Sequence, residues 1–372
     1  MLFDALIVGA GPAGSAAARL LAQAGWRVAL VEKTEFPRRK VCGEFISAPT
    51  TAVLEACGVA AGFAAAAGPP VTRVGVYAGE ALLEGPQVEN WGRALGREHL
   101  DLMLRDAAVA SGAELFQPAE VTALRREGDT YICTLEDGHQ ITARVVIAAC
   151  GSWNAKGIFT VPSGAAKASD LFAFKAHFAN SALPVGLMPL LAFPGGYGGL
   201  VHSDAGRTSL SCCIRRDVLA KARTRHGGKA AEAVLTHIMT TTRGVQRALG
   251  GASLQGGFLS TGPIHPGIRA RRQDGIFFTG NIVGEAHPVI AEGISMAIQA
   301  SGLLARLLIA GDEENYAREW KHRFAPRIRA ASLFAHLAMN DTGRAASLAV
   351  LRAVPALVSL GARLSGKAPI SA

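Results

Sequence analysis

The chain has 372 residues, of which 49% are hydrophobic and 18% are charged, and its formal net charge is +9. This composition excludes a disordered chain, and the length favours two domains that share a surface over one small core. The six cysteines lack C-x-x-C spacing, which argues against a disulfide framework or a metal site and favours a reducing, cytoplasmic location. The N-terminus does not resemble a signal peptide, and no uncharged apolar stretch reaches the length of a membrane span.

Basic residues cluster at residues 38–40 and 269–272 but are otherwise dispersed. Nucleic-acid binding would require a longer basic stripe or a recognisable motif, so no nucleic-acid partner is expected. The positive charge suits an anionic cofactor, an acidic substrate or an anionic membrane surface better.

The chain opens with a strand, a glycine-rich turn, a helix and a second strand. An apolar run ends at Val8, and Gly9, Gly11 and Gly14 follow with G-x-G-x-x-G spacing. Gly9 permits a tight turn, Gly11 lets the backbone approach a pyrophosphate, and Gly14 lets the helix pack closely on the strand. The second strand ends in Glu32, which can accept hydrogen bonds from ribose hydroxyls. The pattern therefore predicts a dinucleotide site with its phosphates at the helix N-terminus.

The next segments extend this nucleotide-binding unit. Residues 98–111 form an amphipathic helical pattern. Residues 121–124, 131–135 and 140–143 indicate a small antiparallel meander, with Asp137 and Gly138 at one turn. Residues 144–149 form a continuous apolar run, which is typical of another parallel strand of the main sheet.

A second sheet is predicted as an insertion into the first unit. Residues 72–77 and 172–178 alternate in hydrophobicity, residues 208–214 form a further strand candidate, and a helical run follows at about 220–249. From residue 275 the chain returns to nucleotide-domain character, with an apolar strand at 275–279 and a small-residue helix from Gly293. We therefore expect an α/β fold with a Rossmann-type domain, an inserted mixed β-sheet domain and a helical C-terminal tail.

The tail contains an amphipathic stretch at residues 347–366, interrupted by Pro355. Two interpretations remain open for it. It could lie on a membrane surface and help to capture a lipophilic substrate, or it could close the substrate pocket and pack on the protein.

Four separated signatures resemble those of FAD-dependent oxidoreductases of the aromatic-hydroxylase superfamily, which includes p-hydroxybenzoate hydroxylase, and particularly its geranylgeranyl-reductase-like branch. They are the G-A-G-P-A-G turn with Glu32, R-R-K-V-C-G-E at residues 38–44, R-E-H-L-D-L-M-L at residues 97–104, and G-N-I-V-G-E-A-H-P-V-I-A-E-G-I at residues 280–294. The resemblance covers nearly the whole chain, and the tail is its weakest part.

The resemblance implies FAD as cofactor and NAD(P)H as electron donor, and it divides the chain into three parts. The FAD-binding domain would comprise residues 1–70, 95–160 and 265–315, the substrate domain residues 71–94 and 161–264, and the C-terminal helical segment residues 316–372. The cofactor contacts that it implies are Gly9, Gly11, Ala13, Gly14, Glu32, Lys33, Arg39, Cys42, Arg97, Val121, Gly280, Asn281, Pro288, Gly293 and Ile294.

Two departures from the family pattern bear on mechanism. Asn281 stands where the family usually has an aspartate, and an amide can still hydrogen-bond a ribityl chain or a pyrophosphate. Cys150 precedes Gly151 where many relatives carry an Asp-Gly pair linked to nicotinamide handling. The W-x-W-x-I pattern of flavin halogenases is absent from the sequence.

Three residues are candidates for the chemistry. Cys42 would be a proton donor or a shape-setting wall, or else a small buried hydrophobe. His287 would donate a proton or orient a reacting group, or else satisfy loop backbone groups. Tyr197 lies in F-P-G-G-Y-G-G, which resembles a substrate-side motif of the family, and it would line the cavity or pack in the core. Glu44 is expected to be a hydrogen-bonding structural acid.

The expected function is NAD(P)H-driven hydroxylation of a hydrophobic aromatic or polyketide-like substrate. One alternative is geranylgeranyl-reductase-like saturation of isoprenoid double bonds, and another is a flavin- or lipid-binding electron carrier without turnover. A hydrophobic small molecule is the expected partner, and the oligomeric state is left open.

Overall fold

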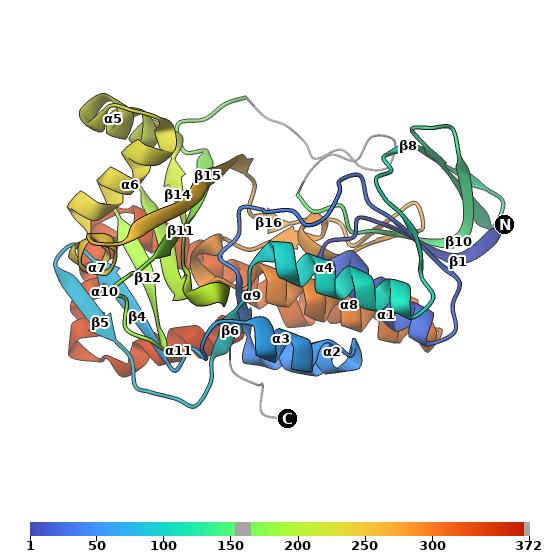
Figure 1. The fold of residues 1–372 in the computed structure, drawn as a ribbon, viewed down its shortest axis with the longest axis horizontal. Coiled ribbons are helices and arrows are strands. Elements are labelled where there is room, and N and C mark those ends of the chain that lie inside the picture. The colour runs from blue at the N-terminus through green and yellow to red at the C-terminus, as the bar shows by residue number, and fades with distance from the viewer. Residues whose placement is uncertain (153–164, 368–372) are drawn as a thin grey trace.

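The computed structural model describes residues 1–152 and 165–367, and Figure 1 shows two sheets at opposite ends of an elongated molecule. The predicted boundary at residues 160 and 161 lies outside the described residues. The first sheet has the strand order β17-β18-β10-β1-β2-β7, and the hairpin β8–β9 joins it through β10. Its strands are β1 (Leu2–Val8), β2 (Val28–Val31), β7 (Glu114–Phe116), β8 (Val121–Glu127), β9 (Thr130–Leu135), β10 (Gln140–Ala148), β17 (Arg272–Gln273) and β18 (Ile276–Phe278).

The pairs from β18 through β10, β1 and β2 to β7 are all parallel, as the continuous apolar runs predict. Helix α1 (Pro12–Gln23) packs against both α4 (Arg97–Ala110) and α8 (Gly293–Ile309), so segments from the two ends of the chain lie side by side. Short helices α2 (Thr51–Ala56) and α3 (Ala60–Ala66) complete this half.

Strand β10 corrects one expectation about the first sheet. Residues 140–143 and 144–149 were expected to be two strands, but β10 runs unbroken from Gln140 to Ala148. Its first residues pair antiparallel with β9, and it pairs parallel with β1 from Thr142 onward. The strand does not end at Arg144 because that charged side chain is exposed and forms an ion pair with Asp4 of β1.

The second sheet has the order β15-β11-β14-β13-β12-β4-β5 and is antiparallel except for the β12–β4 pair. Its strands are β4 (Arg73–Ala78), β5 (Ala81–Glu84), β11 (Leu171–Ala179), β12 (Leu187–Phe193), β13 (Gly196–His202), β14 (Thr208–Arg215) and β15 (Ser253–Ile264). Strands β4 and β5 precede the rest of this sheet by almost ninety residues of sequence, with first-sheet elements in between.

Helices pack on one face of the second sheet and along one of its edges. The predicted run at 220–249 consists of three helices, α5 (Arg216–His226), α6 (Ala230–Thr241) and α7 (Arg243–Leu249). The break between α5 and α6 occurs at Gly227 and Gly228, which both have positive φ angles that favour glycine. Apolar side chains of α6 and α7 pack against Phe174, Phe178 and Leu210 in a separate core cluster.

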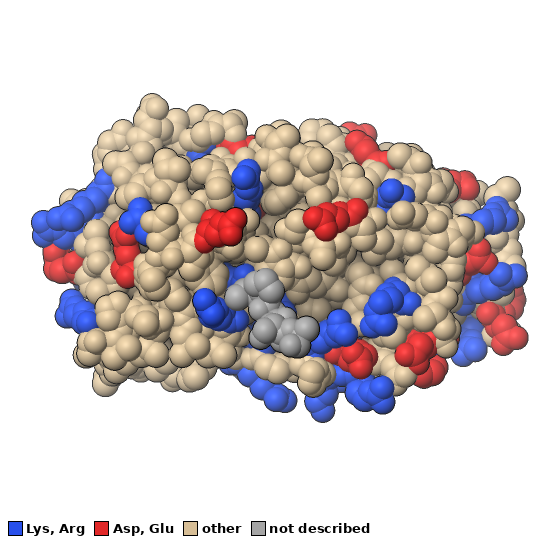
Figure 2. Space-filling view, turned by 90° about the horizontal axis from the view of Figure 1, so that it is seen from below, with Lys and Arg blue, Asp and Glu red and all other residues tan. Residues whose placement is uncertain are grey.

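The tail forms α9 (Tyr316–Met339), α10 (Asp341–Ala353) and α11 (Ala356–Leu364). Helix α9 contacts α8 as well as strands β12 and β13, so it connects the two halves. Among the described helices, none alone is long and apolar enough to cross a bilayer, although α10 and α11, bent by 116°, meet that test as a pair. On the face drawn in Figure 2, Lys and Arg side chains alternate with acidic and uncharged ones around a central hollow.

Short paired strands link these parts. Strand β3 (Phe45–Ser47) pairs with β6 (Gly92–Ala94), and β16 (Gly267–Ile268) pairs with β19 (Gly284–Glu285). Strand β3 follows the loop at residues 38–44, and β6 leads into α4.

Candidate functional site

The glycine-rich turn has the backbone geometry that its sequence predicts. Gly9 has a φ angle of +104°, and a Cβ there would lie 2.6 Å from the Ala149 carbonyl oxygen. A Cβ on Gly14 would lie 1.8 Å from the carbonyl oxygen of Gly9. At Gly11, in contrast, the nearest atoms to such a Cβ are guanidinium nitrogens of Arg97 at 3.8 Å and Arg38 at 3.9 Å. The open side of Gly11 therefore faces two cationic groups at the N-terminus of α1.

A cationic cluster surrounds this helix terminus. Arg97 donates two hydrogen bonds to Asp101, at 2.6 and 2.8 Å. Burial, together with the nearby charges of Arg38 and Arg97, lowers the pKa of Lys40 to about 8. The Nε atom of Arg38 is buried and has no hydrogen-bond partner among the described residues. A partly buried set of cations beside free helix N–H groups fits the diphosphate of a dinucleotide such as FAD.

Glu32 is buried at the end of β2 and accepts several hydrogen bonds. Its donors are the Ala10 backbone N–H at 3.0 Å, the Thr34 hydroxyl at 2.8 Å and an Arg38 guanidinium N–H at 2.7 Å. Burial by itself would raise the pKa of Glu32, but Arg38 and Thr34 hold it below its ordinary value. An ionised Glu32 thus fixes both the turn and Arg38. The neighbouring Lys33 is exposed.

Arg39 is placed differently from the expected cofactor contact. Its Nη2 atom lies 3.3 Å from Nδ1 of His177 on β11, and its guanidinium lies beside Gly256 of β15. The guanidinium next to the glycine-rich turn belongs to Arg38. Arg38 and Arg39 are adjacent in the R-R-K sequence, and the loop directs their side chains toward opposite halves of the molecule.

A buried ionic network joins the loop at residues 38–44 to the second sheet. Both Glu44 oxygens are used, one by the ammonium group of Lys175 and the other by Nε2 of His177 at 2.9 Å. Burial would raise the pKa of Glu44, but His177 and Lys175 lower it to about 2. Glu44 adopts a φ angle of +65°, which is uncommon for a residue with a side chain. Glu44 is thus the structural acid that the sequence predicted.

The sequence analysis did not predict Lys175 and His177 as partners of Glu44. A signal was present, because both occupy alternate positions of the F-A-F-K-A-H-F strand opposite to its phenylalanines. Two basic side chains on one face of a buried strand require an acidic partner.

The segment that leads into α8 lies close to α1, which follows the glycine-rich turn. A Cβ on Gly280 would lie 3.0 Å from the Cβ of Ala13. Asn281 donates a hydrogen bond to the Ser152 hydroxyl at 3.1 Å. Gly293, the first residue of α8, is exposed with no atom within 4 Å of its Cβ position, whereas Ile294 is buried. Gly280, Asn281 and Gly293 all line a hollow of about 260 Å³, and the helix N–H groups at Gly293 could stabilise a nearby anion.

Glu292 immediately precedes α8 and is also buried. It accepts a hydrogen bond from the Ser47 hydroxyl at 3.0 Å, and its other oxygen lies 3.3 Å from Nζ of Lys367. Lys367 in addition donates to the carbonyl oxygen of Ile290. Burial raises the pKa of Glu292 even though Lys367 and Arg327 oppose the shift. The C-terminal segment thus anchors the turn before α8, a role that the sequence did not indicate.

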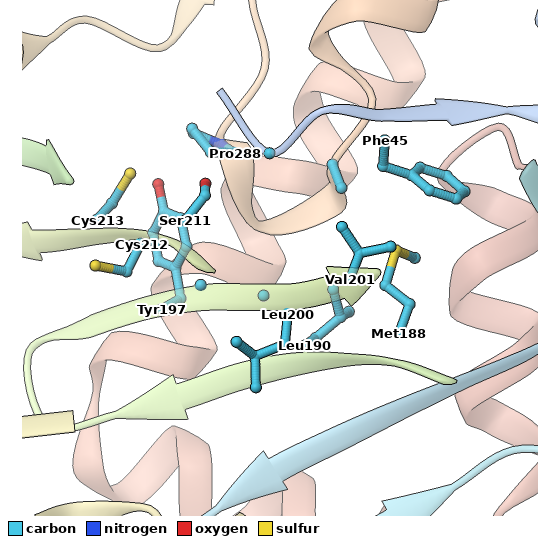
Figure 3. A pocket seen from close by; sticks show the side chains of 14 residues that line it. Phe45, Met188, Leu190, Tyr197, Leu200, Val201, Ser211, Cys212, Cys213 and Pro288 are labelled. Atoms are coloured by element: carbon cyan, nitrogen blue, oxygen red, sulfur yellow. The ribbon is translucent and has the colours of Figure 1, made fainter. Parts of the chain in front are cut away.

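A pocket of about 400 Å³ lies between the second sheet, the loop at Gly43 and the turn after His287. Figure 3 shows Phe45, Met188, Leu190, Leu200 and Val201 toward one end and the polar groups of Tyr197 and Ser211 at the other. Its remaining lining comprises Gly43, Gly198, Gly199, Cys212, Cys213, Pro288 and Ala291. The pocket is therefore an apolar slot with one polar end.

Tyr197 and His287 meet at the polar end of this pocket. The phenolic oxygen of Tyr197 lies 2.9 Å from Nδ1 of His287. Burial raises the pKa of Tyr197 well above its usual value and lowers the pKa of His287 to about 4. Both groups are therefore neutral near pH 7, so the phenol keeps its proton and the imidazole carries one hydrogen on one of its two nitrogens. Pro288 follows His287 and is exposed in the pocket wall.

Cys42 is separate from this pair. Its sulfur accepts a hydrogen bond from the Glu44 backbone N–H at 3.4 Å and also interacts with the Arg97 guanidinium. Its side chain packs against the cluster that contains Leu100 and Ile294, and it is not among the pocket-lining residues. The position of Cys42 therefore fits a contact with the cofactor better than a catalytic role beside Tyr197. Val121 is buried in the core at the start of β8, where only its backbone is available to a ligand.

The residues present fit FAD. Gly11, Arg38, Lys40 and Arg97 would hold the diphosphate, and Gly280, Asn281 and Gly293 would lie farther along the same cofactor.

Comparison with known proteins agrees with this geometry. Residues 3–158 match the family described as FAD binding domain. Menaquinone reductase of Mycobacterium tuberculosis (strain ATCC 25618 / H37Rv) is 33% identical over 153 residues, which are 40% of this chain and 38% of that protein. Menaquinone reductase of Mycolicibacterium smegmatis is 23% identical over 85% of this chain and 79% of that protein. Digeranylgeranylglycerophospholipid reductase 2 of Methanopyrus kandleri is 25% identical over 92% of this chain and 89% of that protein.

Solved structures share the fold over nearly the whole chain. The flavin-dependent brominase Bmp2 superposes with a TM-score of 0.79 at 21% identity, covering 99% of this chain and 94% of Bmp2. PqsL of P. aeruginosa, in complex with 2-aminobenzoylacetate, gives a TM-score of 0.72 at 19% identity, covering 91% and 96%. The chain thus contains a region that matches an FAD binding domain, shares its overall fold with flavin-dependent proteins of known structure, and is similar in sequence to reductases of menaquinone and of a digeranylgeranyl phospholipid.

Proposed function

We propose that the protein reduces a carbon–carbon double bond in a lipophilic, isoprenoid-type substrate, with NAD(P)H as the electron source. The observation that carries the proposal is the Tyr197–His287 pair at the polar end of an otherwise apolar pocket. Bound FAD would supply the hydride for one carbon of the double bond. The chain itself must then supply a proton for the other carbon and keep water out.

The pair can deliver that proton. When His287 carries its hydrogen on Nδ1, it donates to the Tyr197 oxygen, and the phenolic O–H, which also interacts with the Cys213 thiol, can turn toward the substrate carbon. After transfer, the same Nδ1–H donates a hydrogen bond to the phenolate and stabilises it, and the oxygen takes up a proton from solvent once the product has left. Because burial keeps the phenol of Tyr197 protonated well above neutral pH, this proton donor carries its proton before each turnover.

The apolar walls of the pocket determine which substrates can bind in it. Phe45, Met188, Leu190, Leu200 and Val201 offer no hydrogen-bonding side chain, so they favour a hydrocarbon segment over a polar one. The full-length sequence relatives are named as reductases of menaquinone and of a geranylgeranyl-bearing phospholipid, which supports a substrate of this class.

Hydroxylation of a hydrophobic aromatic or polyketide-like substrate is the second candidate. The fold neighbours favour it, because they include PqsL, described as a probable FAD-dependent monooxygenase, with high coverage. The same pocket could hold an aromatic ring between Pro288 and Tyr197. Reduction is preferred because the relatives whose sequences match most of the chain are named as reductases.

One experiment separates the candidates. The FAD-loaded protein is incubated with NADPH or NADH and with menaquinone or a geranylgeranyl phospholipid, with and without oxygen. Mass spectrometry should show a product with two additional hydrogen atoms, formed equally well without oxygen. Product with one added oxygen atom, formed only aerobically, would instead establish hydroxylation. Bound flavin that no nicotinamide donor reduces would favour a non-catalytic carrier.

A further inference from the structure

Helices α10 and α11 expose a group of aliphatic side chains. Val350, Val354, Leu360 and Leu364 are 53%, 47%, 48% and 63% exposed, respectively. Twelve large hydrophobic residues of the described chain are exposed, and these four lie within fifteen consecutive positions. Leu360 and Leu364 are four residues apart on α11 and so share one side of that helix, whereas Val350 lies on α10 and Val354 directly follows it. No residue of α10 is buried. We call these four exposed side chains of the α10–α11 segment the tail patch.

The tail patch is flanked by positive charge. Arg352 and Arg363 are exposed, and neither forms an ion pair or hydrogen bond with another described residue. Asp341 is the only acidic residue between positions 341 and 367, and it pairs with Arg344 at 2.7 Å. Apolar side chains with uncompensated arginines suit a surface that is both apolar and anionic.

The opposite side of α11 packs behind residues that line the pocket. Val358 and Ala362 pack in one cluster with Phe45, Met188 and Val201, which line the pocket. Helical spacing places Val358 and Ala362 opposite Leu360 and Leu364. Helix α11 therefore separates the pocket from the exterior, and Figure 1 shows α10 and α11 together along the edge of the second sheet.

We propose that the tail patch docks on the surface of a bilayer that contains anionic lipids, with α11 between the bilayer and the pocket. A second copy of the chain is a poorer occupant, because a two-fold contact would bring the same arginines against each other. A bilayer supplies both the apolar layer and the negative charge. It would also be the phase that holds the substrate, a point that rests on the proposed function.

The test uses the full-length, FAD-loaded protein and flotation with lipid vesicles, without substrate. Vesicles of phosphatidylcholine alone are compared with vesicles that contain about one third phosphatidylglycerol. We expect binding to the anionic vesicles, weakened by high salt because the attraction is screened. The Arg352→Gln/Arg363→Gln variant should bind on the order of 30-fold more weakly, and Leu360→Gln/Leu364→Gln should also lose binding.

Matched controls alter equivalent residues elsewhere. Arg223→Gln/Arg225→Gln on α5 and Val185→Gln/Leu254→Gln, in the loop before β12 and in β15, remove the same numbers of exposed charges and aliphatic groups. These variants should float like the unaltered protein, and circular dichroism should show that every variant is folded.

The proposal is overturned if the unaltered protein does not float with anionic vesicles, or if the control variants lose as much binding. It is also overturned if light scattering shows a dimer that only the Leu360→Gln/Leu364→Gln variant disrupts, since a second copy would then cover the patch. Failure of the proposed function leaves vesicle binding intact, because flotation needs no turnover. Conversely, detergent-dispersed substrate should be turned over normally by the tail-patch variants.

Discussion

At the scale of single residues, Gly11 shows how the absence of a side chain creates a binding position. Its Cβ position faces the guanidinium groups of Arg38 and Arg97, where a diphosphate would lie. We expect Gly11→Val to leave the protein folded but without retained flavin, because the isopropyl group blocks the approach of the phosphate. Flavin absorbance of the purified protein measures the loss. Gly251→Val is the control, since its Cβ position is open and distant from the turn. A fully yellow Gly11→Val protein would place the phosphates elsewhere.

Tyr197 carries the clearest chemical expectation. Tyr197→Phe preserves the ring but removes the phenolic oxygen that contacts His287. We expect turnover to fall by about 10²–10⁴-fold with flavin content unchanged, because a positioned proton donor contributes about that much. Product formation at saturating substrate measures the effect. Tyr77→Phe, in strand β4 of the same sheet, should leave the rate within a few-fold. Equal rates in the two variants would show that Tyr197 serves only to pack the core.

Cys42 is expected to affect cofactor affinity more than chemistry. Its sulfur contacts Arg97 and the Glu44 backbone instead of lining the pocket. Cys42→Ala should therefore weaken FAD binding by about fivefold, the size of one modest hydrogen bond, with normal turnover at saturating FAD. Equilibrium titration of the flavin-free protein measures the first quantity. A lower turnover number with FAD saturated would instead show that the thiol takes part in the reaction.

At the scale of elements, the contact between the loop at residues 38–44 and β11 depends on Glu44. The pKa of this carboxyl is about 2 in the folded protein against an ordinary 4.5. A lowered pKa means that its ion pairs stabilise the fold above about pH 4.5 and that this contribution is lost as the pH falls toward 2. The difference of 2.5 pKa units corresponds to about 3 kcal/mol.

Glu44→Gln tests this contact. The variant leaves Lys175 buried without its counter-charge, so we expect a loss of about 3–5 kcal/mol in the free energy of unfolding at pH 7. The stability of the variant should also depend less on pH between 2 and 5. Urea unfolding across that range measures both effects. Glu84→Gln removes a half-exposed pair with Arg73 and should cost at most about 1 kcal/mol. Equal losses in the two variants would contradict the assigned importance of the network.

Local patterns predicted most elements but missed those that depend on distant partners. The strand, glycine turn and helix around Gly9–Gly14 are encoded within thirty residues, so periodicity and spacing were sufficient. Strand β15 was not predicted, because Gly256, Gly257 and Gly262 interrupt its alternation and its pairing with β11 contains register shifts. Its neighbour β11 supplies the hydrogen bonds that the sequence pattern does not indicate.

The same limit applies to the site. Sequence motifs predicted Tyr197 and His287 separately, and the structure places them in contact across ninety positions. The partnership of Glu44 with Lys175 spans 131 positions and has no local signature. The anchoring of Glu292 by Lys367 depends on how three tail helices pack, which their amphipathic patterns leave undetermined.

At the scale of the whole molecule, one cofactor would bind residues from both ends of the chain. FAD in hundredfold excess over its dissociation constant should add about 2.7 kcal/mol of stability. Because α9 packs against both halves, we expect the melting temperature to rise in a single transition. Circular dichroism and tryptophan fluorescence should report the same midpoint, with and without FAD. Two transitions, with FAD shifting only one of them, would show that the halves unfold independently.

The split origin of the second sheet restricts how such a protein can be recombined. Strand β12 relies on β4 as its parallel neighbour, although β4 is encoded more than a hundred residues earlier. A chimera that imports only residues 171–264 from a homologue would receive β12 without the edge that evolved beside it. Exchange of substrate preference between homologues must therefore transfer two separate gene segments together, and single-crossover libraries would consist largely of mismatched sheets.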